Sequence, residues 1–372
     1  MKKRVVVSVV NDLSTDRRVG RTCQTLVGLG FEVLLVGRKL KHSLPLPGRS
    51  YETLRMRLVF NKGPFFYAEF NIRIFLLLFF KRADLLVAND LDTLMPNYIH
   101  HRFRKIPLVY DTHEYFTGVP ELMHRPQVQK VWKAIEKWIF PKLRHVITVN
   151  ESIANLYHQE YGVNLQIVRN IPHQVSTGQV LSKKEIGLPE NKRIVLLQGA
   201  GINIDRGAEE AIDAMQWVEG GILVILGGGD VMGQLRQRVV AKGFADRVFF
   251  IPGQPPDLLR SYTCLADIGL TLDKDTNVNY RYSLPNKLFD YIHAGVPILA
   301  SPLPEVKKII DQYDIGVFIE NHEPQHIATK INAMFADMES MSKWKKNLGV
   351  AATELTWENE EKVLNKLFQR YA

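Results

Sequence analysis

The stretch "RIVLLQGAGINIDRGAEEAIDAM", from Arg193 to Met215, carries the pattern that decides the fold. A short apolar run comes first, a loop of small and polar residues follows, and a segment with helical spacing ends the stretch. An uninterrupted apolar run indicates a strand buried on both faces, because a half-exposed strand alternates apolar and polar residues. Strand, loop and helix in this order predict a parallel α/β sheet.

The same order of elements repeats along the chain. Arg4–Val10 and Phe31–Val36 are predicted strands, and Val19–Leu29 is a predicted helix that stops at Gly30. The polar stretch Ile171–Pro189 lacks a clear period and separates two groups of strands. Further strands are predicted in "ADLLVAND", "IPLVYDTHE", "HVITVNES", "GILVILGGG", "DRVFFIPG", "ADIGLTLD" and "GVPILAS".

These strands exceed the number that a single open sheet usually contains. We therefore predict an α/β protein with two doubly wound, Rossmann-like domains facing a cleft. The first domain is expected over residues 1–172 and the second over 173–355, and the amphipathic helix within 356–372 is expected to pack back on the first domain. Such sheets bind ligands outside the carboxyl ends of their strands, so polar residues that follow strands are the site candidates.

Composition excludes several classes of protein. The chain has 372 residues, 46% apolar and 23% charged, as in ordinary globular proteins. The densest apolar run, Ile74–Phe80, is seven residues long, which excludes a polytopic protein whose spans need ~20 residues each. Two cysteines exclude a disulfide scaffold and a four-thiolate zinc site. The opening "MKKRVVVSVVND" predicts a buried strand rather than a signal peptide, so a cytoplasmic location is expected.

The net charge of +9 is unevenly distributed. Residues 1–170 hold 26 Lys+Arg and 14 Asp+Glu, which gives +12, and the remaining residues hold 22 and 25, which gives −3. A basic half favours an anionic partner such as nucleic acid, an anionic membrane face or a phosphorylated acceptor. A solvated surface that is simply basic is the alternative interpretation.

The segment "YSLPNKLFDYIHAGVPILAS", Tyr282–Ser301, predicts a helix followed by a buried strand. Pro285 suits the first helical position and Ser283 is a candidate N-cap. Lys287 then falls in the first turn, where the helix dipole disfavours a cation unless an anion binds there. Asp290 lies on the same helix face, and its carboxylate could accept both hydroxyls of a ribose. A capped amphipathic helix with a surface lysine and aspartate is the other interpretation.

A second cation follows the strand of the opening stretch. Arg206 comes after the small residues Gly199 and Gly201, near a helix start, and its planar fork suits phosphate oxygens. Together, Arg206 and Lys287 predict a pair of cations on one diphosphate. The glycine patch Gly227–Asp230 also follows a strand, but it lacks the later glycine of a dinucleotide fingerprint.

Ionisable residues also follow strands in the first half. In "VYDTHEYF", the strand ends at Asp111, and His113 and Glu114 come next. His113 could hydrogen-bond a sugar hydroxyl or transfer a proton, and a purely structural histidine is the alternative.

Two Asp-x-Asp triplets, Asp90–Asp92 and Asp273–Asp275, could hold a divalent metal against a diphosphate. Because the two basic side chains already supply positive charge, we expect no metal ligands and no required cofactor.

The segment Phe65–Arg82 is strongly apolar with basic residues interspersed. It predicts a buried helix of the first domain, with a membrane-facing surface as the alternative. The nearby segments His100–Pro107 and Arg125–His145 add basic and aromatic side chains of the kind that bind anionic membrane interfaces.

Taken in order, these motifs resemble those of a retaining glycosyltransferase with the GT-B fold, specifically family 4. "TDRRVGRTCQTLVGLGFEV" is similar to the opening of that family, and "LLQGAGINIDRG" resembles its donor-diphosphate loop. "GILVILGGGD" and "DRVFFIPGQPPDLLRSYTCLADIGLTL" resemble the central strands and base-binding loop of its second domain. "SLPNKLFDYIHAGVPILAS" resembles its donor-site helix, and the resemblance covers nearly the whole chain.

The resemblance implies roles for individual residues. Arg206 and Lys287 would bind the donor diphosphate, Asp290 the ribose, and His113 the transferred sugar, so His113, Arg206 and Lys287 are the expected catalytic residues. The loop Ile251–Pro256 would face the base. The other expected donor contacts are Gly199, Gly201, Gly228, Ile251, Leu284 and Asn286, and the candidate acceptor or cleft residues are Asn11, Arg18, Asp90, Asp111 and Glu114.

The chain departs from the family pattern at three positions. Two glutamates that the family often has eight residues apart are Tyr282 and Asp290 here, and the arginine common after the loop's first glycine is Ala200. A branch with "PNK(L)F(E/D)Y" shares the first departure, so it does not indicate an inactive protein.

The resemblance implies transfer of a sugar from a nucleotide-diphosphate sugar, UDP favoured, to a glycan or lipid-linked acceptor with retention of configuration. It favours a role in cell-surface polysaccharide synthesis, with the protein cytoplasmic and peripheral on the inner membrane face through its basic first domain. The alternatives are a non-catalytic relative that binds nucleotide sugar, a sugar-nucleotide epimerase and a basic nucleic-acid-binding protein. No nucleic-acid motif is present, so no nucleic-acid partner is expected.

Overall fold

The computed structural model describes residues 2–14, 16–41, 43–46, 48–173 and 181–372. The chain forms two compact units: residues 1–170 with 359–372 make unit 1, and residues 171–358 make unit 2. The sequence-based boundaries at 172/173 and 355/356 lie close to this division. Residues 174–180 of the expected polar linker lie outside the described residues.

Within its described residues, unit 1 contains a seven-stranded parallel sheet with the order β3-β2-β1-β4-β5-β6-β7. The paired registers are parallel throughout, as the apolar strands predicted. The strands are β1 (Arg4–Asp12), β2 (Glu32–Arg38), β3 (Glu52–Met56), β4 (Leu85–Asn89), β5 (Leu108–Thr112), β6 (His145–Thr148) and β7 (Gln166–Ile167).

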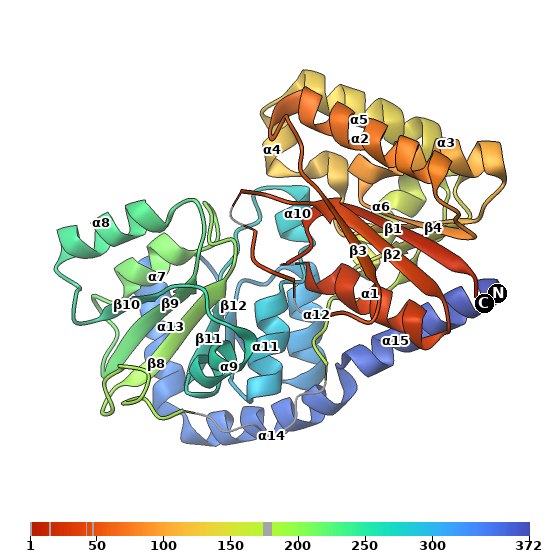
Figure 1. Ribbon diagram of the computed structural model, residues 1–372. Coiled ribbons are helices and arrows are strands. Elements are labelled where there is room, and N and C mark those ends of the chain that lie inside the picture. The colour runs from red at the N-terminus through yellow and green to blue at the C-terminus, as the bar shows by residue number, and fades with distance from the viewer. Residues whose placement is uncertain (1, 15, 42, 47, 174–180) are drawn as a thin grey trace. The chain divides into compact units, whose positions relative to one another are not determined.

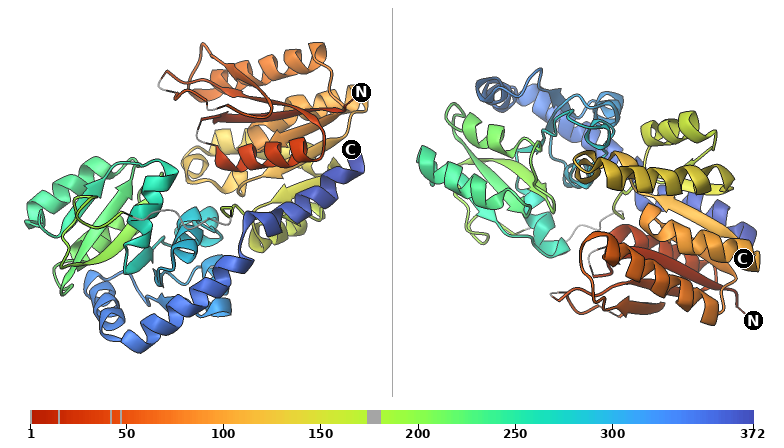
Figure 2. Two further views of the ribbon diagram at one scale, coloured as in Figure 1. Left: turned by 60° about the horizontal axis from the view of Figure 1, so that its bottom comes forward. Right: turned by 90° about the horizontal axis from the view of Figure 1, so that it is seen from above.

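Helices cover this sheet on both faces, as Figures 1 and 2 show. Helix α2 packs beside α3, and α3 also contacts α5. The α-helices of unit 1 are α1 (Arg17–Gly28), α2 (Gly63–Phe80), α3 (Leu91–Arg104), α4 (Pro120–Met123), α5 (Pro126–Ile139), α6 (Glu151–Tyr161) and most of α15 (Trp357–Phe368). The short 3₁₀ turns are η1 (Phe116–Gly118), η2 (Phe140–Lys142) and η3 (Gln369–Tyr371).

Unit 2 contains, among its described residues, a six-stranded parallel sheet with the order β10-β9-β8-β11-β12-β13. Its strands are β8 (Arg193–Gly199), β9 (Gly221–Gly227), β10 (Val248–Ile251), β11 (Ile268–Thr271), β12 (Ile298–Ala300) and β13 (Gly316–Phe318). Its helices are α7 (Ala208–Ala214), α8 (Met232–Lys242), α9 (Pro256–Cys264), α10 (Val278–Arg281), α11 (Asn286–Ala294), α12 (Pro304–Tyr313), α13 (Pro324–Ala336) and α14 (Met338–Glu354).

Both sheets are doubly wound, which confirms the predicted class. In each sheet the first strand lies between the second and the fourth, so the winding direction reverses beside β1 in unit 1 and beside β8 in unit 2. Crossover helices diverge to opposite faces at such a switch point, which leaves a crevice at the carboxyl ends of the strands. We therefore expect ligand-binding residues in the loops after β1 and β4 and in those after β8 and β11.

Helix α11 begins slightly later than the sequence suggested. Pro285 is its N-cap, with an extended backbone and no side-chain cap, so the expected capping role of Ser283 is wrong. Asn286 and Lys287 form the first turn, and Gly295 ends the helix in a left-handed conformation, at φ 69°. Because the N-cap residue Pro285 supplies no side-chain cap, the start of α11 is suited to receive an anion at its N–H groups.

Helix α2 is buried on one side only, which corrects the expectation of a fully buried helix. By length and composition, Gly63–Phe80 is the one helix among the described residues that could cross a membrane, yet 28% of it is buried within the protein. Its covered side is formed by Phe66, Phe70, Asn71, Ile74 and Leu78.

The C-terminal helix α15 is anchored in unit 1 beyond residue 358. The Glu360 carboxylate accepts from the Arg169 guanidinium at 2.5 Å and from the Arg169 backbone N–H at 2.7 Å. The Thr25 hydroxyl donates to Glu361 at 2.7 Å, and Leu364 is fully buried. Apolar burial and paired charges therefore hold this helix to unit 1.

Candidate functional site

In unit 2, the two predicted cations meet at one buried carboxylate. Arg206 follows β8 and its Nη1 lies 3.1 Å from Oδ1 of Asp273, while Nζ of Lys287 in α11 lies 3.4 Å from Oδ2. Asp273 follows β11 and is fully buried. Because β8 and β11 flank the switch point, the cluster lies where a doubly wound sheet binds its ligand.

The cluster keeps an excess of positive charge, since two cations share one carboxylate. Burial lowers the pKa of Lys287, with Arg206 acting in the same direction and Asp273 opposing them. For Arg206, burial acts to lower the pKa, but Asp273 outweighs it and the pKa is raised. The guanidinium carbon of Arg206 also lies 4.0 Å from the ring centroid of Tyr280. An anion placed here would relieve the repulsion between the cations and find both already positioned.

Two buried polar atoms near this cluster in the chain have no hydrogen-bond partner among the described residues. They are Nε of Arg206 and the hydroxyl of Ser283. Leaving a buried donor unsatisfied costs roughly 1–3 kcal/mol, so orphaned groups commonly mark a place where a ligand binds. Their presence supports an anion site at the start of α11.

Asp290 is held by a chain of hydrogen bonds from the sheet. Nε2 of Gln198 donates to the Asp290 carboxylate at 2.8 Å, and Oε1 of Gln198 accepts from the Thr263 hydroxyl at 2.8 Å. Gln198 lies near the carboxyl end of β8 and is buried. Its amide therefore fixes the carboxylate that we expect at the ribose, one turn along α11 from Lys287.

The loops that follow β8 and β9 are joined through their backbones. The N–H of Gly228 donates to the carbonyl of Gly199 at 3.1 Å, and the N–H of Ile202 donates to that of Gly228 at 2.8 Å. A Cβ on Gly229 would lie 2.0 Å from the Ile202 carbonyl oxygen, whereas a Cβ on Gly228 would meet nothing within 4 Å. The tight approach thus falls on Gly229, and Gly228 faces open space.

This contrast gives a matched pair of variants. Gly229→Ala is expected to lower the thermal midpoint of unit 2, because its φ of +159° and the backbone collision both oppose a side chain. Gly228→Ala is expected to leave that midpoint within about 2 °C while weakening nucleotide binding. Differential scanning calorimetry and nucleotide titration distinguish the two, and equal destabilisation by both variants would contradict the loop geometry.

The remaining expected donor residues occupy three different environments. Ile251 ends β10 and is half-buried, Leu284 packs on the apolar core of unit 2, and Asn286 is exposed at the start of α11. Gly201 has room around it, since the nearest atom to an added Cβ is Nδ2 of Asn203 at 3.9 Å. Their roles at the donor stay predictions.

In unit 1, a second polar cluster forms at the carboxyl ends of β4 and β5. The Asp90 carboxylate accepts from the backbone N–H of His113 at 2.8 Å, and its other oxygen lies 3.2 Å from His113 Nδ1. Asp90 adopts a left-handed φ of 58° as the N-cap residue of α3. A non-glycine residue in this region is strained, and such strain is concentrated at functional sites.

Arg18 and Asp111 lie beneath this cluster and face each other. Two nitrogens of the Arg18 guanidinium contact the Asp111 carboxylate at 2.7 and 3.2 Å, and the third donates to the Val168 carbonyl at 2.6 Å. Their side chains are only 4% and 1% exposed. Because their polar atoms are used within the protein, the geometry favours a role in positioning the edge that carries His113. Their assignment as acceptor or cleft residues stays a prediction.

The two carboxylates determine the charge of His113. Burial acts to lower the pKa of the ring, but Asp90 and Asp111 outweigh it and hold the pKa well above its usual range. The Arg18 guanidinium holds the pKa of Asp111 down to about 2 against the effect of burial. Both carboxylates therefore favour the protonated ring, which suits a hydrogen-bond donor better than a base. Its Nε2 has no hydrogen-bond partner among the described residues.

The raised pKa makes the stability of unit 1 dependent on pH. The contribution of His113 is complete below its unfolded pKa of 6.5 and is lost as the pH rises through the higher folded value. Relative to His113→Gln, the wild-type advantage is expected to shrink by up to about 1.4 kcal/mol per pH unit above that point. Hydrogen exchange of β5 amides at pH 6 and pH 8 measures it, and an advantage that grows with pH would contradict the assignment.

The other two unit 1 candidates lie at the same edge. Asn11 is exposed near the end of β1, and its amide donates to Asp16 at 2.9 Å. Asp16 in turn caps α1 by accepting from the N–H of Val19 at 3.0 Å. Glu114 follows His113, and its carbonyl accepts from the Tyr157 hydroxyl at 3.2 Å.

Neither Asp-x-Asp triplet gathers its carboxylates at one point. Asp273 lies between the two cations, whereas Asp275 pairs with Arg281 at 3.1 Å. Asp90 contacts His113, and burial raises the pKa of Asp92 well above its usual range. Over the parts of the chain that the structure describes, no three His, Cys, Asp or Glu side chains are grouped as metal ligands.

Sequence reasoning missed the residues that organise these clusters. Asp273 was considered only as a metal ligand, and Gln198 and Tyr280 were not considered. A buried glutamine at the end of an otherwise apolar strand was the available signal for Gln198, since β8 reads "RIVLLQG". No local pattern indicates that Tyr280 stacks on Arg206, because the two are distant in the chain.

Comparisons with known proteins agree with this geometry. The family model described as glycosyltransferase family 4 matches residues 15–179, and that of glycosyl transferases group 1 matches residues 180–348. In a comparison of sequences with curated proteins, nothing matches.

Several solved structures share the fold over the whole chain. Sucrose-phosphate synthase from Thermosynechococcus elongatus matches with a TM-score of 0.81 and 16% identity, covering 99% of each chain. HepE from Anabaena in complex with UDP-glucose matches with a TM-score of 0.72 and 14% identity, again covering 99% of each chain. WaaG, a glycosyltransferase involved in lipopolysaccharide biosynthesis, matches with a TM-score of 0.73 and 16% identity, covering 97% of this chain and 99% of that one.

Two doubly wound units, each with polar clusters at the carboxyl ends of its strands, define an enzyme of the GT-B glycosyltransferase class. The two family models together span residues 15–348, and the chain belongs to the family 4 type of these glycosyltransferases.

Proposed function

We propose that the enzyme transfers a sugar from a nucleotide-diphosphate sugar to a glycan or lipid-linked acceptor with retention of configuration. The observation that carries the donor assignment is the convergence of Arg206 and Lys287 on Asp273 at the start of α11. A diphosphate placed there would meet two cations and an uncapped helix N-terminus. UDP is the favoured nucleotide, and the UDP-glucose complex of HepE supports that choice.

In the proposed reaction, the bond between the anomeric carbon and the diphosphate oxygen breaks while a bond to the acceptor oxygen forms. Negative charge develops on the departing diphosphate, and Arg206 and Lys287 stabilise it from fixed positions. The proton of the acceptor hydroxyl passes to the departing phosphate on the same face of the sugar. This path retains configuration and requires no covalent nucleophile from the protein.

His113 would bind the transferred sugar as a hydrogen-bond donor. Its Nε2 is buried, lies 3.7 Å from an Asp111 oxygen and makes no hydrogen bond among the described residues, so its N–H is the donor that a bound sugar oxygen would have to approach. Both neighbouring carboxylates favour the protonated ring. Arg18 keeps Asp111 ionised and so supports that state indirectly. Because two side-chain cations supply the positive charge, we also propose that transfer needs no metal and no other cofactor.

For the acceptor and the biological role, we propose cell-surface polysaccharide synthesis, with the enzyme cytoplasmic and peripheral on the inner face of the membrane. The basic first half of the chain, +12 over residues 1–170, supports an anionic or lipid-linked acceptor. The involvement of WaaG in lipopolysaccharide biosynthesis supports the same class of product.

Ligand-detected NMR against UDP, GDP and ADP, followed by nucleotide-release assays with the matching sugars, tests the proposal. The expected result is selective binding of UDP and release of UDP when an acceptor is added, with the product anomer matching the donor. Nucleotide-sugar binding without release would favour a non-catalytic relative, a role that the replacement of a family glutamate by Tyr282 would suit. Conversion of the donor sugar without transfer would favour an epimerase.

A further inference from the structure

Helix α2 is apolar on two opposite sides, although the protein covers only one of them. An amphipathic surface helix presents polar residues to water, and a helix that is apolar all round is normally enclosed by protein or by lipid. In α2 the residues spaced for the outward face form an exposed apolar stripe, with Phe65 66% and Phe80 79% exposed. The stripe consists of Phe65, Ile72, Leu76, Phe79 and Phe80.

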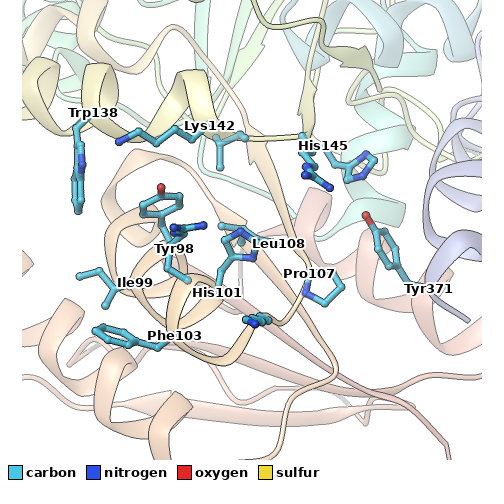
Figure 3. A pocket seen from close by; sticks show the side chains of 14 residues that line it. Tyr98, Ile99, His101, Phe103, Pro107, Leu108, Trp138, Lys142, His145 and Tyr371 are labelled. Carbon is cyan, nitrogen blue, oxygen red and sulfur yellow. The ribbon is translucent and has the colours of Figure 1, made fainter.

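A basic, aromatic pocket of about 1250 Å³ lies in the same unit, between the ends of α3 and α5. Figure 3 shows the rings of Tyr98 and Trp138 at one side of it and those of His145 and Tyr371 at the other. The fourteen lining residues, all in the described part of the chain, include no Asp or Glu. Its fixed positive charges come from Arg102, Lys105, Lys142 and Arg144.

One contact links the apolar stripe to helix α3, whose last residues line the pocket. The guanidinium of Arg104, at the end of α3, lies 5.3 Å from the ring centroid of Phe79 in α2. Phe103 beside it lines the pocket and is 80% exposed. On the far side, Nζ of Lys142 lies 5.3 Å from the Trp138 ring, whose side chain is 48% exposed. Exposed aromatic rings therefore lie beside cations at both helices, at Arg104 and at Lys142.

This surface is separate from the sites described above. Pro107 and Leu108 line the pocket at the amino end of β5, whereas Asp111 and His113 lie at its carboxyl end. Five residues of strand separate the two ends by about 15 Å. Helix α2 follows β3 and precedes β4, so it runs from the carboxyl edge of the parallel sheet to the amino edge.

We propose that the stripe and the pocket together form a docking face for anionic phospholipid membranes. The rings of the stripe and of Phe103 and Trp138 would enter the interfacial layer, and the pocket would hold phosphate headgroups. Basic residues beside exposed aromatic rings are the composition of interfacial anchors, since the apolar part enters the headgroup boundary and the cations attract anionic lipid. Charge complementarity selects lipid over an apolar protein partner. The buried side of α2 keeps the helix on the unit, so it lies along the membrane rather than across it.

Co-sedimentation of the full-length chain with vesicles tests this face without any sugar donor. Wild type is expected to bind vesicles of phosphatidylglycerol and phosphatidylcholine at 0.1 M salt and to bind pure phosphatidylcholine far less. Lys142→Gln with Arg144→Gln is expected to lower partitioning by about 25-fold, since each cation contributes about fivefold. Phe79→Ser with Phe80→Ser is expected to remove the binding that remains at 0.5 M salt.

Matched controls lie in unit 2, where Val240 is 78% exposed and Lys345 and Lys346 are exposed in α14. Val240→Ser and the double change Lys345→Gln with Lys346→Gln are expected to leave partitioning within twofold. All the altered side chains lie at the surface, so circular dichroism should match wild type. UDP affinity is measured in parallel and reports the donor site separately.

Three results would overturn the docking face. The first is wild-type vesicle binding by both double variants, and the second is no vesicle binding by wild type. The third is that the chain does not bind vesicles but binds soluble glycerol phosphate saturably, or forms a dimer that dissociates in the Phe79→Ser, Phe80→Ser variant. If UDP binding fails while vesicle binding follows the expected pattern, only the donor proposal is lost.

Discussion

Replacing Lys287 by alanine is expected to lower the rate of sugar transfer by about 10²–10³-fold, and Arg206→Ala is expected to have an effect of the same size. The reason is electrostatic, because each side chain supplies a fixed positive charge where the diphosphate becomes more negative. Neither change should unfold the protein. After either one, the Asp273 carboxylate still has one cation within 3.1 or 3.4 Å.

Lys274 provides the matched control for this prediction. Lys274 lies in the loop after β11 that also carries Asp273. Its Nζ contacts the Glu210 carboxylate at 2.5 Å instead of Asp273. Lys274→Ala is expected to keep transfer within a few fold of wild type. The measurement is the initial rate of nucleotide release with saturating acceptor, together with the thermal midpoint of each variant. Wild-type turnover in both Arg206→Ala and Lys287→Ala would refute the donor site.

Replacing Arg18 by methionine is expected to give the largest loss of stability, about 3–5 kcal/mol in unit 1. Its partner Asp111 is 1% exposed and would remain as a buried carboxylate without its bidentate donor. Hydrogen exchange of amides in α1 and β5 measures the loss locally. Amides of β8 and β9 in unit 2 serve as the internal reference and should not change.

A double variant separates the buried charge from the packing. In Arg18→Met with Asp111→Leu, no ion remains uncompensated, so most of the lost stability is expected to return. If the double variant is as unstable as the sum of the single changes, the two side chains do not act as a pair. The same outcome would remove the argument that Arg18 positions the edge carrying His113.

The strands that sequence reasoning found and those it missed differ in their place in the sheets. The apolar runs predicted β4, β5, β8, β9, β11 and β12, which are central strands covered on both faces. Missing were β3, β7 and β13, all of which are edge strands, whereas the edge strand β10 was predicted from the apolar run in "DRVFFIPG". β3 reads "ETLRM" and is largely exposed, because an edge strand with one open side does not need a continuous apolar run.

For helix α2 the sequence predicted more burial than the structure shows. Its apolar composition predicted burial, but composition does not say how many neighbours a helix will have. In the structure α3 lies beside it and its far side is open, which leaves Phe65 and Phe80 exposed. The pattern of apolar positions in a sequence is the same whether protein or lipid covers them.

The sequence by itself determined the class of fold, two doubly wound sheets, and singled out Arg206, Lys287, Asp290 and His113. It could do so because strand burial and helix starts depend on residues that are neighbours in the chain. Only the tertiary structure decided that Asp273 joins the two cations, that Gln198 holds Asp290 and that Arg18 is buried against Asp111. The pairs Arg206–Asp273, Gln198–Asp290 and Arg18–Asp111 join residues 67 to 93 positions apart, and no local pattern records that proximity.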